Sequence, residues 1–144
     1  MVDFNEIYKD MGAPVRVGLV GAGEFGASLI TQSLGHPAID VPVVADIDIC
    51  RDTASARDAM TAGKVAVVPD GLLLVDTDID LVVEATGAPE AAAAVSEAAI
   101  LAGKHLVLAS KEMASVCGPW LARLAAERGV VYTLPDGDQP SLLI

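Results

Sequence analysis

An apolar run that passes directly into a G-x-G-x-x-G pattern constrains this chain more than any other feature of its sequence. The run is Val15–Val20, and the pattern is formed by Gly21, Gly23 and Gly26. Between a strand and a helix, such glycines give a tight turn, a close approach of backbone to a pyrophosphate, and close packing of the helix on the sheet. The N–H groups that open the helix would then face the phosphates. The context predicts a dinucleotide site, with a glycine-rich turn that binds no ligand as the alternative.

A carboxylate follows where the ribose of such a ligand would lie. Asp46 ends the next apolar run, about 20 residues after Gly26, and an acid at this distance accepts hydrogen bonds from ribose hydroxyls. Because a 2′-phosphate would meet this carboxylate, Asp46 favours NAD over NADP. Arg51 follows closely and could cover an adenine or pair with a 2′-phosphate, so NADP is the alternative cofactor.

Apolar and helix-like runs alternate from residue 16 to residue 134, which predicts an α/β fold with a parallel sheet covered on both faces. Strands are expected at 15–20, 41–46, 65–68, 80–85, 106–109 and 130–134. Helices are expected at 24–34, 53–62 and 89–102, with about one helical turn at 72–75 and a last helix that Pro119 opens and Gly129 ends. The glycine motif at the first turn then predicts a Rossmann-type, doubly wound, three-layered sheet in the order 3-2-1-4-5-6. Residues 1–14 form a leading segment, and 15–144 the dinucleotide-binding domain.

Composition excludes several classes of function. A net charge of −11 argues against nucleic acid and against an anionic membrane surface. The chain lacks an uncharged apolar run of about 18 residues, and Asp3 and Glu6 stand where a signal peptide needs basic residues. Two cysteines, and histidines without ligand spacing, predict neither a disulfide framework nor a metal site. A soluble cytoplasmic protein is expected.

Further candidates follow the fourth and fifth strands, whose carboxyl ends would meet the ligand. The backbone of Thr86 and Gly87 could line the nicotinamide ribose, or form an ordinary loop between strand and helix. The Lys111 amine could reach that ribose or a substrate oxygen, with a solvated loop lysine as the alternative. Glu84 is the one acid in an apolar strand, and it is paired, exposed at the strand end, or near the site.

Four segments resemble the nucleotide-binding half of homoserine dehydrogenases: VGLVGAGEFG at 17–26, VVEATG at 82–87, GKHLVLASKE at 103–112 and GPWLARLAAERGV at 118–130. The closing DGDQP at 136–140 is similar to one branch, the homoserine-dehydrogenase-like oxidoreductases that often carry a C-terminal SAF domain and include DXR-like enzymes. The chain departs from the family pattern at Ser110, where homoserine dehydrogenases have Asn before the lysine. It departs from the branch in the shorter segment 113–117.

The resemblance implies an NAD(P)-dependent oxidoreductase that transfers hydride between a nicotinamide and a small polar substrate, with Lys111 as the candidate catalytic residue. It also implies a homo-oligomer, and a substrate and dimerisation domain beyond residue 144, so the fragment is expected to be inactive alone. The residues expected to contact the cofactor are Gly21, Gly23, Glu24, Phe25, Gly26, Asp46, Arg51, Thr86, Gly87, Ser110 and Lys111.

Two other classes remain open. A non-enzymatic NAD(H)-sensing module would also bind a dinucleotide, but no output domain is visible in these residues. A methyltransferase also has a glycine loop after its first strand. Thr86 and Gly87, however, do not match the polar-proline-aromatic motif usual at the fourth strand of such enzymes.

Overall fold

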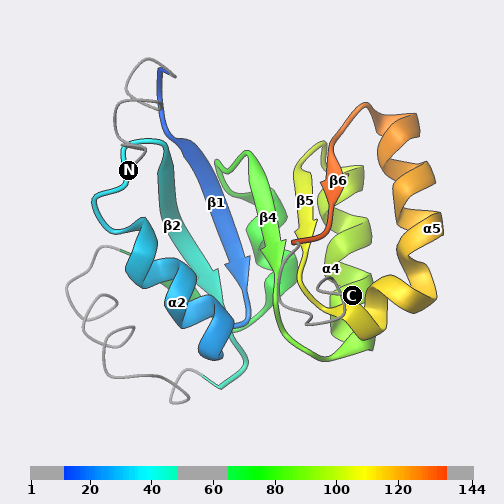
Figure 1. Ribbon diagram of the computed structural model, residues 1–144, viewed down its shortest axis with the longest axis horizontal. Helices are drawn as coiled ribbons and strands as arrows, with labels where there is room; N and C mark the ends of the chain where they lie inside the picture. The colour runs from blue at the N-terminus through cyan, green and yellow to red at the C-terminus, as the bar shows by residue number, and fades with distance from the viewer. Residues whose placement is uncertain (1–11, 49–64, 136–144) are drawn as a thin grey trace, which may run out of the picture.

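The computed structural model describes residues 12–48 and 65–135. Six parallel strands form one sheet in the order β3-β2-β1-β4-β5-β6, as predicted. The strands are β1 (Val15–Val20), β2 (Ile39–Ala45), β3 (Ala66–Val68), β4 (Leu81–Glu84), β5 (His105–Leu108) and β6 (Tyr132–Thr133). From β1 the chain adds β2 and β3 on one side, and then returns to add β4, β5 and β6 on the other side. The point where the strand order reverses therefore lies between β1 and β4, at the centre of the sheet (Figure 1).

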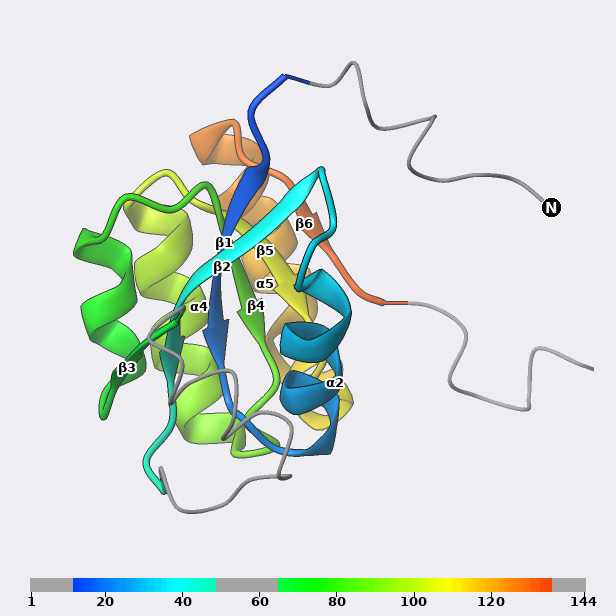
Figure 2. The ribbon, with the colours of Figure 1, turned by 90° about the vertical axis from the view of Figure 1, so that its left-hand side faces the viewer.

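Helices cover both faces of this sheet, so the predicted three layers are confirmed. The helix α2 (Glu24–Ser33) lies on one face, and α4 (Pro89–Leu101), α5 (Lys111–Arg128) and the 3₁₀ helix η1 (Gly71–Asp76) lie on the other. Figure 2 views the sheet nearly along its plane, with α4 to the left and α2 to the right. No helix in the described part of the chain is long and apolar enough to cross a membrane.

The core is divided between the two faces because successive side chains of a strand point to opposite sides. On β1, Leu19 faces α2, where it packs with Ile30, and Val20 faces α4. Burying each such side chain contributes about 1.5–3 kcal/mol. The larger of the two clusters joins η1, α4 and α5 through Leu74, Val82, Val95, Ile100, Leu106, Leu108, Met113 and Leu121.

The prediction that Pro119 opens a helix is wrong. The helix α5 begins at Lys111, and Pro119 lies inside it. A proline there cannot donate to the carbonyl of Ser115 and normally breaks a helix. The side chains of Met113 and Leu121, before and after the proline, are both almost fully buried against the core. Packing on both sides therefore holds the helix through the proline, and Gly129 ends it with φ +69°, as predicted.

The other predicted elements agree with the structure to within two residues at most ends. The expected turn of helix at 72–75 is η1, and the last strand is shorter than 130–134. The predicted helix at 53–62, Arg51 and most of the leading segment lie outside the described residues.

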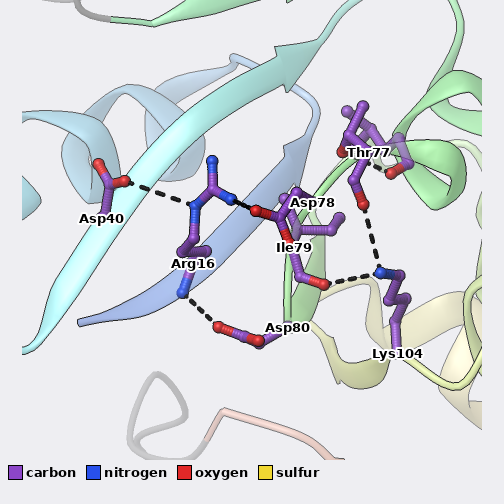
Figure 3. A network of polar contacts seen from close by, with 8 residues as sticks. Arg16, Asp40, Thr77, Asp78, Ile79, Asp80 and Lys104 are labelled. Atoms are coloured by element: carbon purple, nitrogen blue, oxygen red, sulfur yellow. Dashed lines mark hydrogen bonds and ion pairs between the residues drawn. The ribbon is translucent and has the colours of Figure 1, made fainter. Parts of the chain in front are cut away.

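Polar contacts tie the strands together at the amino end of the sheet, away from the glycine turn. The backbone N–H of Arg16 donates to Asp80 Oδ2 at 2.9 Å, and the guanidinium pairs with Asp78 and, more distantly, with Asp40 (Figure 3). Beside them, Lys104 Nζ donates to the carbonyl oxygens of residues 77 and 79. Exposed ion pairs contribute about 0–1 kcal/mol each, so this network mainly fixes the turn before β4.

Candidate dinucleotide-binding site

The carboxyl ends of four strands meet at one edge of the sheet. Backbone hydrogen bonds continue the ladder just past the strand ends: the N–H of Gly21 donates to Ala45, that of Ala85 to Val20, and that of Ala109 to Glu84, each at 2.8 Å. The loops that follow β1, β2, β4 and β5 therefore start side by side. The sequence predictions placed the candidate residues on these loops.

Two glycines of the motif are required by the fold. Gly21 has φ +97°, and a Cβ there would lie 2.6 Å from the carbonyl oxygen of Ala85. A Cβ on Gly26 would overlap the carbonyl oxygen of Gly21 and come within 3.2 Å of Leu19 Cδ2. The turn is thus pressed against the β4 loop on one side and against α2 on the other.

Gly23 is different, because its local structure does not need a glycine. Its φ is −63°, and a Cβ there would meet no atom within 4 Å. It is the N-cap of α2, and no side chain caps the helix at this end. The open space in front of Gly23 lies beside the first N–H groups of α2, which suit an anion. This is the position that the sequence predicts for a pyrophosphate.

Asp46, which the sequence predicts to face a ribose, organises the glycine turn. Its Oδ2 accepts a hydrogen bond from the N–H of Ala22 at 2.5 Å, and its Oδ1 accepts one from the N–H of Asp48 at 2.8 Å. A carboxylate has about four acceptor positions, so these two bonds leave it able to accept from ribose hydroxyls. The side chain is half-buried.

Two cavities lie on either side of the loop that follows β4, and both are lined by Ala85. The larger, of about 630 Å³, contains Gly21, Gly23, Asp46 and Thr86. The smaller has a volume of about 360 Å³. Both fall in the range of small-molecule sites. Apolar side chains of η1, of α4 and of its N-cap complete the larger cavity, namely Leu72, Ala91, Ala94, Val95 and Ala88.

The smaller cavity brings together the candidates from α2, β4 and α5. Phe25, half-exposed, lines it with Gly87, Ser110 and Lys111. Lys111 is exposed and is the first residue of α5. A cation at a helix N-terminus is opposed by the helix dipole, so helix stability does not explain this lysine. Glu24 is exposed in the first turn of α2 and lines neither cavity.

The hydrogen bonds that hold the loop after β4, one of them from the loop after β5, were not predicted from the sequence. Glu84 is fully buried, and its Oε1 accepts from Thr86 twice, from the N–H at 2.7 Å and from Oγ1 at 2.6 Å. The hydroxyl of Ser110, also buried, accepts from the N–H of Gly87 at 3.2 Å. The one feature of the sequence that pointed to these bonds was Glu84, an acid in an otherwise apolar strand.

The histidines have structural roles. The Nδ1 atom of His36 accepts from the N–H of Ala38 at 3.2 Å, and the Nδ1 atom of His105 accepts from the N–H of Val131 at 3.0 Å. Among residues 12–48 and 65–135, no three histidine, cysteine or acidic side chains are grouped as metal ligands would be.

Comparison with known proteins gives consistent relatives. The family model described as the homoserine dehydrogenase NAD-binding domain matches residues 21–135. The homoserine dehydrogenase of Bacillus subtilis (strain 168) is 27% identical over 120 residues, which is 80% of this chain and 28% of that protein.

Two solved structures carry the same fold at 30% identity, each with a TM-score of 0.65. A homoserine dehydrogenase from Thiobacillus denitrificans covers 84% of this chain, which spans 29% of that structure. A biliverdin reductase from Synechocystis sp. PCC 6803, in complex with biliverdin and NADP⁺, covers 85% of this chain, which spans 38% of that structure. The chain therefore corresponds to well under half the length of each relative.

Proposed function

The chain belongs to the family of homoserine dehydrogenase NAD-binding domains, and from this premise we propose that its glycine turn binds the pyrophosphate of NAD(H) in preference to NADP(H). The observation that carries the proposal is the contrast among the three glycines. Packing accounts for Gly21 and Gly26, whereas Gly23 only keeps open the space in front of α2. An anion bound by the N–H groups at the start of α2 would occupy that space, and a side chain at position 23 would exclude it.

The two cavities would take the two halves of the dinucleotide. The apolar side chains of the larger cavity suit an adenine, with Asp46 accepting from the ribose beside it. The nicotinamide would lie in the smaller cavity, near Phe25 and Ser110. Bound there, a nicotinamide supplies or accepts a hydride. The ammonium of Lys111 would orient the nicotinamide ribose or a substrate oxygen.

For the whole protein we propose a homo-oligomeric oxidoreductase that moves hydride to or from a small polar substrate. Family membership and the homoserine dehydrogenase relatives support this class. The alternatives of an NAD(H)-sensing module and of a methyltransferase gain no support from these comparisons.

Titration calorimetry of the 144-residue chain with NADH and with NADPH tests the proposal. We expect NADH to bind more tightly, and Gly23→Val to abolish binding with the thermal midpoint within a few degrees of wild type, since its side chain would enter open space. Gly21→Val is the contrasting variant and should fail to fold, because its Cβ would strike the β4 loop. Undiminished affinity in Gly23→Val would move the pyrophosphate elsewhere.

A further inference from the structure

We propose that Glu84 is a positioning residue for the bound cofactor, acting through the loop 85–88 that separates the two cavities. Glu84 lines neither cavity, so any effect it has on the ligand must pass through this loop. The inference rests on the proposed function, because that function places the dinucleotide against both sides of the loop.

Stability does not explain a carboxylate at this position. Glu84 is 0% exposed, its Oε2 makes no hydrogen bond, and no ion pair joins it to any described residue. Burying a carboxylate is expensive unless it is paired and fully hydrogen-bonded. An apolar side chain would fill the same space in the cluster that contains Val82 and Leu106 at lower cost. We therefore assign the role of this acid to its bonded oxygen, which accepts twice from Thr86.

That oxygen sets the direction of a short chain of hydrogen bonds. A carboxylate can only accept, so the hydroxyl of Thr86 must donate its proton to Glu84. The lone pairs of the same hydroxyl are then turned toward the N–H of Ala88, which donates to it at 3.1 Å. Together with the bond from the Thr86 N–H, this fixes the loop from the end of β4 to the first turn of α4.

The loop is held from the neighbouring strand as well. Ser110, which follows β5, accepts from the N–H of Gly87 with a side chain that is 5% exposed. Gly87 itself has φ +66°, a conformation that glycine adopts without strain. Residues 85, 86 and 88 line the larger cavity, and residues 85 and 87 line the smaller. Movement of this one loop would displace a wall of each cavity, and displacements of about 1 Å are costly at a reacting centre.

The test is a double-mutant cycle on the 144-residue chain. Glu84→Gln keeps the shape and one accepting oxygen but replaces the charge-assisted bonds from Thr86 with weaker neutral ones, whereas Thr86→Val removes only the hydroxyl and its bond. Each should weaken NADH binding about tenfold, equivalent to about 1.4 kcal/mol, and speed hydrogen exchange of the amides of residues 86 and 87. Because both substitutions weaken the same bond, from Thr86 Oγ1 to Glu84 Oε1, the double variant should bind NADH about as tightly as the weaker-binding single variant.

Three controls separate positioning from a merely structural role. Thr86→Ser keeps the hydroxyl and should restore wild-type affinity. Glu97→Gln makes the same charge change on the exposed face of α4 and should leave affinity and amide exchange unchanged. The thermal midpoint of Glu84→Gln should not fall below that of the wild type, because the variant removes a buried charge.

The outcomes distinguish this proposal from the one on which it rests. If the wild-type chain does not bind NADH, the proposed function fails. If the wild type binds but Glu84→Gln and Thr86→Val bind equally well, the positioning role is overturned. Additive losses in the double variant would also overturn it, as would a loss of affinity matched by a lower thermal midpoint. Should Glu84→Gln fail to fold, Thr86→Val with its Ser control decides the matter.

Discussion

Two carboxylates, one on each side of β1, hold the loops of the candidate site by accepting hydrogen bonds from the loop backbone. Asp46 follows β2 and accepts from the backbone of the glycine turn, and Glu84 ends β4 and accepts from the backbone of the next loop. Hydrogen bonds to a charged acceptor contribute about 1.5–3 kcal/mol, more than neutral ones. Each acid thus uses its charge to fix the backbone that would face a ligand.

The double role of Asp46 predicts a specific outcome for Asp46→Asn. The amide can accept through one oxygen only, so either Ala22 or Asp48 loses its acceptor. We expect NADH affinity to fall about tenfold, about 1.4 kcal/mol. Affinity for NADPH should fall less or rise, because the repulsion between the carboxylate and the 2′-phosphate disappears. Calorimetric titration with both cofactors measures the ratio.

A matched variant separates the local effect from the change in net charge. Asp76→Asn removes the same charge from an exposed position at the end of η1, outside both cavities. It should leave the ratio of the two affinities as in the wild type. An unchanged ratio in Asp46→Asn would show that Asp46 does not face the ribose that carries the 2′-phosphate.

The placement of these residues could be predicted, but their bonds could not. The distance from Gly26 to Asp46 and the apolar run before Glu84 put both acids at strand ends from the sequence alone. The bonds from Thr86 to Glu84 and from Asp48 to Asp46 are local, but the bonds between loops depend on how neighbouring loops lie in three dimensions. The bond between Asp46 and Ala22 joins residues 24 positions apart, and no local pattern encodes it. The same holds for Ser110 and Gly87.

At the scale of elements, the strands were predictable because each buried run is apolar on both faces and most helices end at a glycine. The helix α5 was not, because proline is a strong local signal for a helix start and the packing of Met113 that overrides it is a tertiary effect. Local and global preferences therefore conflict at Pro119.

This conflict predicts that Pro119→Ala stabilises the chain. An alanine would restore the hydrogen bond to the carbonyl of Ser115 at an exposed position. A proline in a helix interior destabilises the folded state by about 3 kcal/mol. Its replacement also makes the unfolded chain more flexible, which lowers the gain in stability by up to about 1 kcal/mol. We expect the free energy of unfolding in urea to rise by about 2 kcal/mol.

Pro37→Ala serves as the control, since Pro37 is exposed in a turn before β2. It should be neutral or destabilising by up to about 1 kcal/mol. A Pro119→Ala variant that is no more stable than the wild type would contradict a continuous α5.

For the whole molecule, the sheet edge provides a surface that can hold a cofactor, but it offers few groups for chemistry. Hydride transfer needs the substrate carbon about 3–3.5 Å from the nicotinamide, with a group that transfers the proton. Lys111 and Glu112 are the titratable side chains that line the smaller cavity among the described residues. The chain spans 28% of its relative from Bacillus subtilis, so most of that enzyme has no counterpart in these 144 residues.

We therefore predict that this chain binds NADH without turnover of its own. The assay follows NADH absorbance with homoserine and a panel of hydroxy acids, in the presence of NAD⁺ or NADP⁺. The full-length Bacillus subtilis homoserine dehydrogenase provides the positive control, and calorimetry on the same preparation shows that the cofactor site is intact. The expected rate is indistinguishable from that of the buffer, because Lys111 and Glu112 are the titratable side chains that the described residues contribute to the smaller cavity. A rate within about tenfold of the full-length enzyme, a barrier difference of about 1.4 kcal/mol, would place a complete catalytic site within this chain. Lys111→Ala would then be the first variant to examine.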